Sequence, residues 1–189
     1  AMAVPTAIWD SVMAQRSARS ALELDSNNAQ AVSLWLASNL RKEIELPAGA
    51  TDPTRDTHSD AAFFALAAGP VYVNPILTRA LDAHEAPLAL RAIDVLEQTG
   101  GTTGRSSAGD PSPLVRALSY PDRSVPFHAA FALARANPAA PFPSHFRVVP
   151  ILAEAISSTG APSAVVVSTD EDKRNKMAEM QRNDPAHYT

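Results

Sequence analysis

The chain has 189 residues, 46% hydrophobic and 19% charged, and a formal net charge of −4, which is typical of a folded domain rather than a disordered or fibrous protein. Because it has no cysteine, disulfides, thiolate metal sites and cysteine nucleophiles are excluded. Its weakly acidic balance argues against nucleic-acid binding, and no apolar run reaches the roughly 18–20 residues that membrane insertion needs.

The N-terminal part of the chain shows helical spacing. Residues 1–5 lack the features of a signal peptide and resemble a leader that remains after tag removal, so the compartment stays open. Apolar residues then recur every three or four positions over 6–24 and 28–45, which predicts two helices. Either Asn27 or Asn28 is expected to cap the second helix. A short third helix is predicted over residues 59–68.

From residue 70 onward, a proline followed by two aliphatic residues recurs at a spacing of about 40 residues. Each proline is expected to open a helix, since the first N–H groups of a helix need no partner. Second helices are predicted over residues 88–98 and 127–136, the latter with Ser124 as its cap. The three prolines are Pro75, Pro113 and Pro150.

Two segments resemble known helical repeats. Residues 122–133 have an acidic turn residue, Val three positions later and a helix of small residues, which resembles the second helix of a HEAT repeat. The family usually has Arg or Lys after the Val, where this chain has Pro126. Residues 70–157 as a whole are similar to HEAT-repeat (armadillo-like) proteins of planctomycete type. Residues 21–31 resemble the junction between two tetratricopeptide (TPR) helices.

The resemblance implies an all-α fold, an α-solenoid of HEAT-like helical hairpins. A TPR-like hairpin over residues 6–47 would cap its first face, and the HEAT-like repeats would occupy residues 57–160. A non-repetitive helical bundle whose prolines coincide remains the alternative interpretation.

Residues 161–189 depart from the helical pattern. A β-branched run over 164–167 predicts a short strand, and the acids of 170–172 and a polar helix follow it. This order resembles the first βα unit of a receiver domain, in which such acids help to hold Mg²⁺, so we expect a fragment of a further domain. Because a lone strand leaves its backbone groups unpaired, it is expected to be disordered, to pack loosely, or to pair with a second chain in a homodimer.

No group of residues in the sequence points to catalysis. The five histidines lack metal-ligand spacing, and residues 100–107 lack the Lys and the spacing of a phosphate-binding loop. No carboxylate pair is set off in the context of a pocket, and no GxSxG motif is present. We therefore expect no enzyme activity, no cofactor and no metal.

The expected function is a non-catalytic protein–protein interaction scaffold that binds another protein or a neighbouring domain of the same chain. The alternative is a docking module of a signalling protein whose receiver-like domain begins near Ala164. Phe142 and Phe146 are expected to seal the join between the second and third repeats, and to anchor a partner if they are exposed. The candidate partner-binding residues are Arg79, Arg91, Arg116, Phe142 and Phe146.

Overall fold

The computed structural model describes residues 4–54, 61–99, 111–138 and 141–158. Of these residues 74% are helical and none forms a strand, which confirms the all-α class for this part of the chain. The chain divides into two compact units, Ala1–Ile151 and Leu152–Thr189. In chain order the helices are η1 (Thr6–Ile8), α1 (Trp9–Leu24), α2 (Ala29–Glu45), α3 (Ala61–Ala68), α4 (Pro70–Asp82), α5 (Ala86–Gln98), α6 (Pro113–Ala117), α7 (Ser124–Ala136), η2 (His145–Arg147) and α8 (Val148–Ser157).

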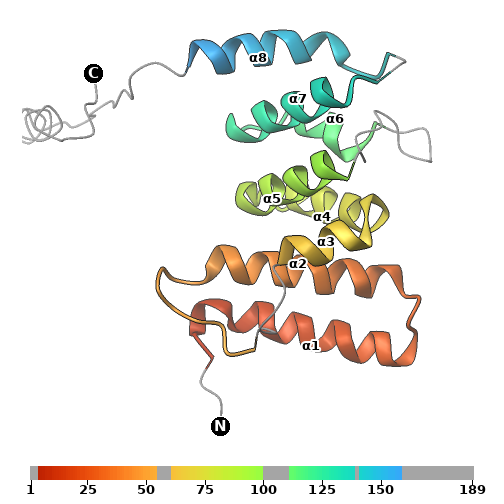
Figure 1. Cartoon of the computed structure of the whole chain (residues 1–189), viewed down its shortest axis with the longest axis vertical. Coiled ribbons are helices and arrows are strands. Elements are labelled where there is room, and N and C mark those ends of the chain that lie inside the picture. The colour runs from red at the N-terminus through yellow and green to blue at the C-terminus, as the bar shows by residue number, and fades with distance from the viewer. Residues whose placement is uncertain (1–3, 55–60, 100–110, 139–140, 159–189) are drawn as a thin grey trace, which may run out of the picture. The chain divides into compact units, whose positions relative to one another are not determined.

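Helices α1 and α2 form an antiparallel hairpin, as their sequence spacing predicts (Figure 1). Ile8 and Val12 on one side and Leu36 and Leu40 on the other are buried between them and the next helices. Asn28 caps α2, because its side-chain oxygen accepts a hydrogen bond from the backbone N–H of Ala31 at 3.0 Å. The structure thus selects Asn28 from the two expected caps.

The following helices of the first unit pack in layers on α2 (Figure 1). Helix α4 packs against α2 and α5, α5 against α7, and α6 against both α4 and α7. The buried side of α7 includes three alanines beside Val125, Pro126 and Leu133, and the small side chains let neighbouring helices approach closely. Its fully buried alanines are Ala129, Ala130 and Ala132.

Of the three helix starts that the prolines predict, one is confirmed and two differ. Helix α8 begins at Val148, so Pro150 lies in its first turn rather than at its start. Pro113 opens α6 as expected, and Ser112 Oγ accepts a hydrogen bond from Val115 N. The prediction for Pro75 is wrong, because α4 already begins at Pro70, after Gly69 with φ 84° separates it from α3. Pro75 therefore lies inside α4, in its second turn.

The cap of α7 also differs from the prediction. Ser124 is the first residue of the helix rather than its cap, and its backbone N–H donates to Asp122 Oδ1 at 2.9 Å. Pro126 falls in the first turn, where a missing N–H costs little, and it is buried. The helix ends at Ala136, and its C-cap Asn137 adopts the left-handed conformation with φ 44°.

The predicted strand over 164–167 and the acids of 170–172 lie outside the described residues, as do His58, His187 and the glycine-containing segment 100–107. Within the described ranges, no single helix is long and apolar enough to cross a membrane. By length and composition, α3 and α4 pass that test only as a pair, across a bend of 119°.

Candidate functional site

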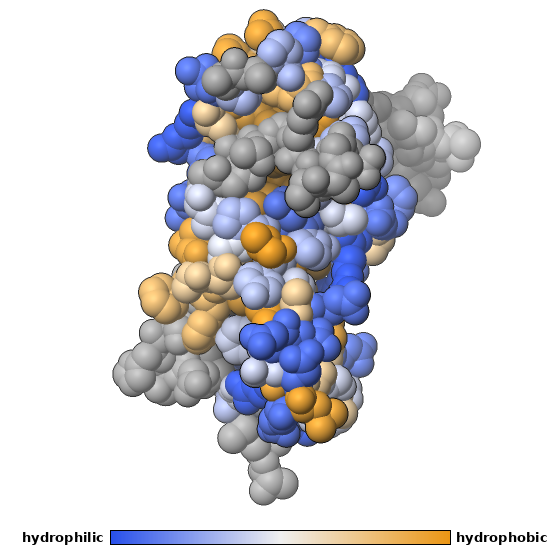
Figure 2. All heavy atoms as spheres, turned by 90° about the vertical axis from the view of Figure 1, so that its right-hand side faces the viewer, coloured by the Kyte–Doolittle hydropathy of each residue, from blue (hydrophilic) through white to orange (hydrophobic). Residues whose placement is uncertain are grey.

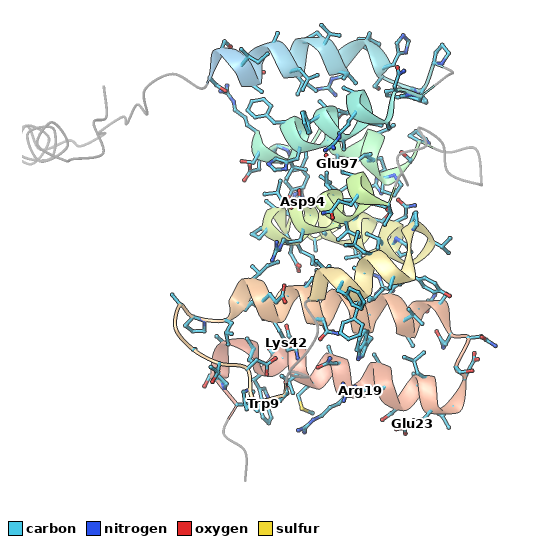
Figure 3. All side chains as sticks on the ribbon, in the orientation of Figure 1. Trp9, Arg19, Glu23, Lys42, Asp94 and Glu97 are labelled. Atoms are coloured by element: carbon cyan, nitrogen blue, oxygen red, sulfur yellow. The ribbon has the colours of Figure 1, made fainter. Side chains whose placement is uncertain are left out.

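A buried ion pair joins α2 to the segment that follows it. Lys42 Nζ donates hydrogen bonds to Asp52 Oδ2 at 2.8 Å and to Thr54 Oγ1 at 3.2 Å. Asp52 Oδ1 also accepts from the backbone N–H of Thr54 at 2.8 Å and from its hydroxyl at 2.6 Å. The side chains of Lys42 and Asp52 are only 4% and 5% exposed. The pair therefore holds the segment of residues 46–54 against α2, the helix that carries Lys42 (Figure 3).

Hydrogen bonds keep the carboxyl group of Asp52 in its charged form. Burial would raise the pKa of Asp52, but the hydrogen bonds from Lys42 and Thr54 and the positive charge of Lys42 outweigh it, so this pKa lies below its ordinary value of 3.8. The carboxylate and the ammonium each have a partner, which burial requires. The arrangement suits a structural clasp.

A cavity of about 40 Å³ with both polar and apolar lining residues adjoins the clasp between α1, α2 and α3. Gln15 Nε2 donates to Asn39 Oδ1 at 2.8 Å in its wall, and the rings of Trp35 and Phe64 meet edge-on with centroids 5.0 Å apart. This volume admits a few waters at most. Among the described residues, no buried side-chain nitrogen or oxygen lacks a hydrogen-bond partner.

Sequence reasoning missed the clasp, although one signal for it was present. Lys42 follows Ala31, Trp35 and Ser38 at intervals of four, three and four residues, so it falls on the inward face of its helix. A lysine on such a face needs an acidic partner, and Asp52 is the first acid after the helix ends.

Ion pairs link each hairpin to the next. Arg91 on α5 lies 3.4 Å from Glu43 on α2, and Arg116 on α6 lies 2.6 Å from Asp82 on α4. On α7, Arg135 lies 2.5 Å from Glu97 and His128 lies 3.4 Å from Asp94, and both acids project from α5 (Figure 3). In these four pairs the later helix supplies the base and the earlier one the acid, whereas the pair of Arg41 on α2 with Glu85 at the start of α5 has the opposite order.

A groove of about 210 Å³ lies between the first two hairpins. Small residues such as Ala37 and Ala80 lie beside Leu34 and Ile76 in its lining. Arg41 and Arg79 also line it, and Arg41 bonds to Glu85 at the start of α5. Arg79 is exposed and has no hydrogen-bonding or ionic partner within the part of the chain that the structure describes.

Arg91 lines a different groove, of about 370 Å³, among α2, α3, α5 and α7. Asp94, Glu97 and Arg135 share that groove, where Glu97 pairs with Arg135 and Asp94 Oδ1 lies 3.4 Å from His128 Nδ1. The structure therefore does not bring Arg79 and Arg91 into one site, and it places Arg116 in its pair with Asp82 outside both linings.

The two predicted aromatic residues differ in exposure. Phe146 is 71% exposed, so it does not seal a join, whereas Phe142 is half-buried and its ring meets His145 edge-on at 6.1 Å. Other large apolar side chains are also exposed, and apolar and hydrophilic residues alternate over the face in Figure 2. The exposed large apolar side chains include Trp9, Leu24, Phe63, Val71, Phe131 and Val149.

Within the described ranges, no three His, Asp or Glu side chains lie close enough together to hold a metal ion.

The sequence matches no protein-family model, and comparisons with curated proteins and with solved structures give no significant match.

Proposed function

We propose that this protein is a non-catalytic scaffold, built as a solenoid of HEAT-like hairpins, that binds an acidic segment of a partner protein in the groove lined by Arg41 and Arg79. The proposal rests on one observation, which concerns the ion pairing of Arg79. Helices α2 to α7 carry five arginines, and Arg79 is the one without a partner in the described part of the chain.

The groove offers two kinds of interaction to such a segment. Its small side chains allow a backbone to approach closely, and half-buried Leu34 adds apolar contact. A partner carboxylate at the rim would form paired hydrogen bonds with the Arg79 guanidinium, which presents its N–H groups as a planar fork. Since Arg41 already bonds to Glu85, Arg79 is the residue that selects for acid.

The proposal is tested by capture of partners from the source cells on the 189-residue chain, followed by titration calorimetry with the identified partner. Arg79→Glu is expected to weaken binding at least tenfold, because it places a carboxylate where the partner's acid would sit. Arg16→Glu makes the same charge change on the exposed surface of α1 and serves as the matched control. Equal affinities for the wild type and Arg79→Glu would refute the proposed site.

The signalling alternative predicts a different result in the same experiment. If the tail carries the interaction, Asp170→Ala in the 189-residue chain would abolish partner binding, while Arg79→Glu would leave it unchanged.

A further inference from the structure

Glu85 occupies one of the two arginines of the proposed binding groove from within the chain. Its Oε2 accepts a hydrogen bond from Arg41 Nη2, and both residues line the groove together with Arg79. The side chains of Arg41 and Glu85 are 40% and 37% exposed, so water reaches the pair. Ion pairs with this degree of exposure contribute little to stability, so a second carboxylate can compete for the arginine. The groove therefore already holds an internal acid of the kind that a partner would bring.

Glu85 differs from the two other glutamates whose ion pairs join α5 to its neighbours. The side chains of Glu43 and Glu97 are only 16% and 18% exposed, and their arginines, Arg91 and Arg135, come from later helices. The arginine of Glu85 comes from the earlier helix α2, and Glu85 itself is about twice as exposed as the other two. A carboxylate held in this way is easier to displace from its arginine than the more buried acids.

The position of Glu85 in its own helix lowers the cost of this displacement. Glu85 is the N-cap residue of α5, but its side chain makes no capping hydrogen bond. Its carboxylate is therefore not needed to close the end of the helix. After release from Arg41 it would remain beside the N-terminus of α5, where the partial positive charge of the helix stabilises an anion.

We propose that Glu85 is a built-in competitor for the acidic segment that the groove binds, an inference that rests on the proposed function. A first acid of the segment pairs with Arg79, and a second acid displaces Glu85 and pairs with Arg41. Once Arg79 holds the segment, the second acid competes with Glu85 at a high effective concentration. A segment with a single acid gains only the contact with Arg79. The groove thus selects segments that carry at least two acidic groups.

The first test measures binding of a dye-labelled hexaglutamate peptide to the 189-residue chain by fluorescence anisotropy at low salt. Glu85→Gln is expected to tighten binding about fivefold, because it removes the internal acid and leaves Arg41 available. Asp82→Asn is the matched control, since it also removes an exposed acid and releases an arginine, Arg116, but outside the lining of the groove. The control should change the affinity by less than about twofold.

The second test asks whether the effect of Glu85 passes through Arg41. In an Arg41→Gln background, adding Glu85→Gln should tighten hexaglutamate binding no more than Asp82→Asn does in the wild type. A peptide of the same length with one glutamate among glutamines should gain about twofold at most from Glu85→Gln, because it reaches one arginine at a time. An equal gain in the wild-type and Arg41→Gln backgrounds would mean that Glu85 acts through net charge alone, and would overturn the proposal.

Arg79→Glu separates this inference from the function on which it rests. Equal hexaglutamate affinities of the wild type and Arg79→Glu would refute the groove as the binding site, and the role of Glu85 with it. Weaker binding by Arg79→Glu, combined with no gain in Glu85→Gln, would overturn the role of Glu85 and leave the proposed function standing. A gain in Asp82→Asn as large as that in Glu85→Gln, or no binding of hexaglutamate to Glu85→Gln, would also contradict the role of Glu85.

Discussion

Lys42 Nζ and Asp52 Oδ2 lie 2.8 Å apart with both side chains almost fully withdrawn from water. The ion pair closes the segment after α2 onto the helix, and Thr54 completes it by donating its N–H and hydroxyl to the same carboxyl group. Desolvating two charges is costly, so the pair is stable only while both members are present.

Replacement of one member should therefore destabilise the protein strongly. We expect Lys42→Met to lower the free energy of unfolding by about 3–5 kcal/mol, since it leaves the Asp52 carboxylate buried without its cation. Urea denaturation measures this loss. Arg116→Met, at the exposed pair with Asp82, is the comparison and should cost about 1 kcal/mol or less.

A double variant distinguishes the cost of an unpaired charge from the cost of lost packing. Lys42→Met with Asp52→Asn removes both charges, so it should be more stable than Lys42→Met alone. If the double variant is as unstable as the single one, the cost comes from lost packing rather than from an unpaired charge.

The lowered pKa of Asp52 makes the contribution of the clasp depend on pH. In the folded protein this pKa lies below the ordinary 3.8, so the unfolded chain binds the proton more readily. The stabilisation is therefore complete well above pH 3.8, and it is lost as the pH falls through the folded pKa. The gap in unfolding free energy between wild type and Asp52→Asn, measured between about pH 2.5 and 7, should be constant near neutrality and narrow below about pH 4. A gap that widens on acidification would contradict the direction of this shift.

Much of the first unit could be predicted from the sequence because its helices follow simple apolar spacing. The recurrence of apolar residues at three- and four-residue intervals was enough to predict the spans of α1 and α2. The same spacing predicted the C-terminal parts of α5 and α7. Helix starts were harder, because a proline is allowed anywhere in a first turn and even beyond it. That is why Pro113 marked its helix correctly and Pro75 did not.

The candidate site depended on contacts that no local pattern encodes. Arg91 and Arg116 could be placed on solvated helix faces, but their acids, Glu43 and Asp82, belong to other hairpins. The lack of a partner for Arg79 in the described residues follows only from how α2 and α4 pack. Side-chain exposure at Phe146 likewise depends on the tertiary arrangement.

The cap of α2 offers a local test. Asn28 accepts a hydrogen bond from Ala31 N, so Asn28→Ala should lower the free energy of unfolding by about 1 kcal/mol. Its neighbour Asn27 is exposed, and the hydrogen bond at that position comes from its backbone N–H to Asp25 Oδ1, which a side-chain replacement preserves. Asn27→Ala is thus the control, expected within about 0.5 kcal/mol of wild type. Thermal unfolding of both variants decides the matter, and equal losses would contradict the assignment of Asn28 as the cap.

Pro75 in α4 and Pro113 in α6 should respond oppositely to replacement by alanine. Pro75 lies in the second turn of α4, where it has no N–H for the carbonyl of Val71. Pro75→Ala restores that hydrogen bond, and because residue 75 is exposed, no packing is lost. We expect the free energy of unfolding to rise by about 1–3 kcal/mol, somewhat less than the full cost of a proline inside a helix.

Pro113 is the matched control, because it occupies the first position of α6, where the N–H has no partner in any helix. Pro113→Ala returns no hydrogen bond and frees the unfolded chain, so it should lower stability by about 0.4–1 kcal/mol. Urea denaturation of the two variants beside the wild type measures both changes. A loss of stability in Pro75→Ala equal to that in Pro113→Ala would mean that α4 effectively begins at residue 75, as the sequence spacing alone predicts.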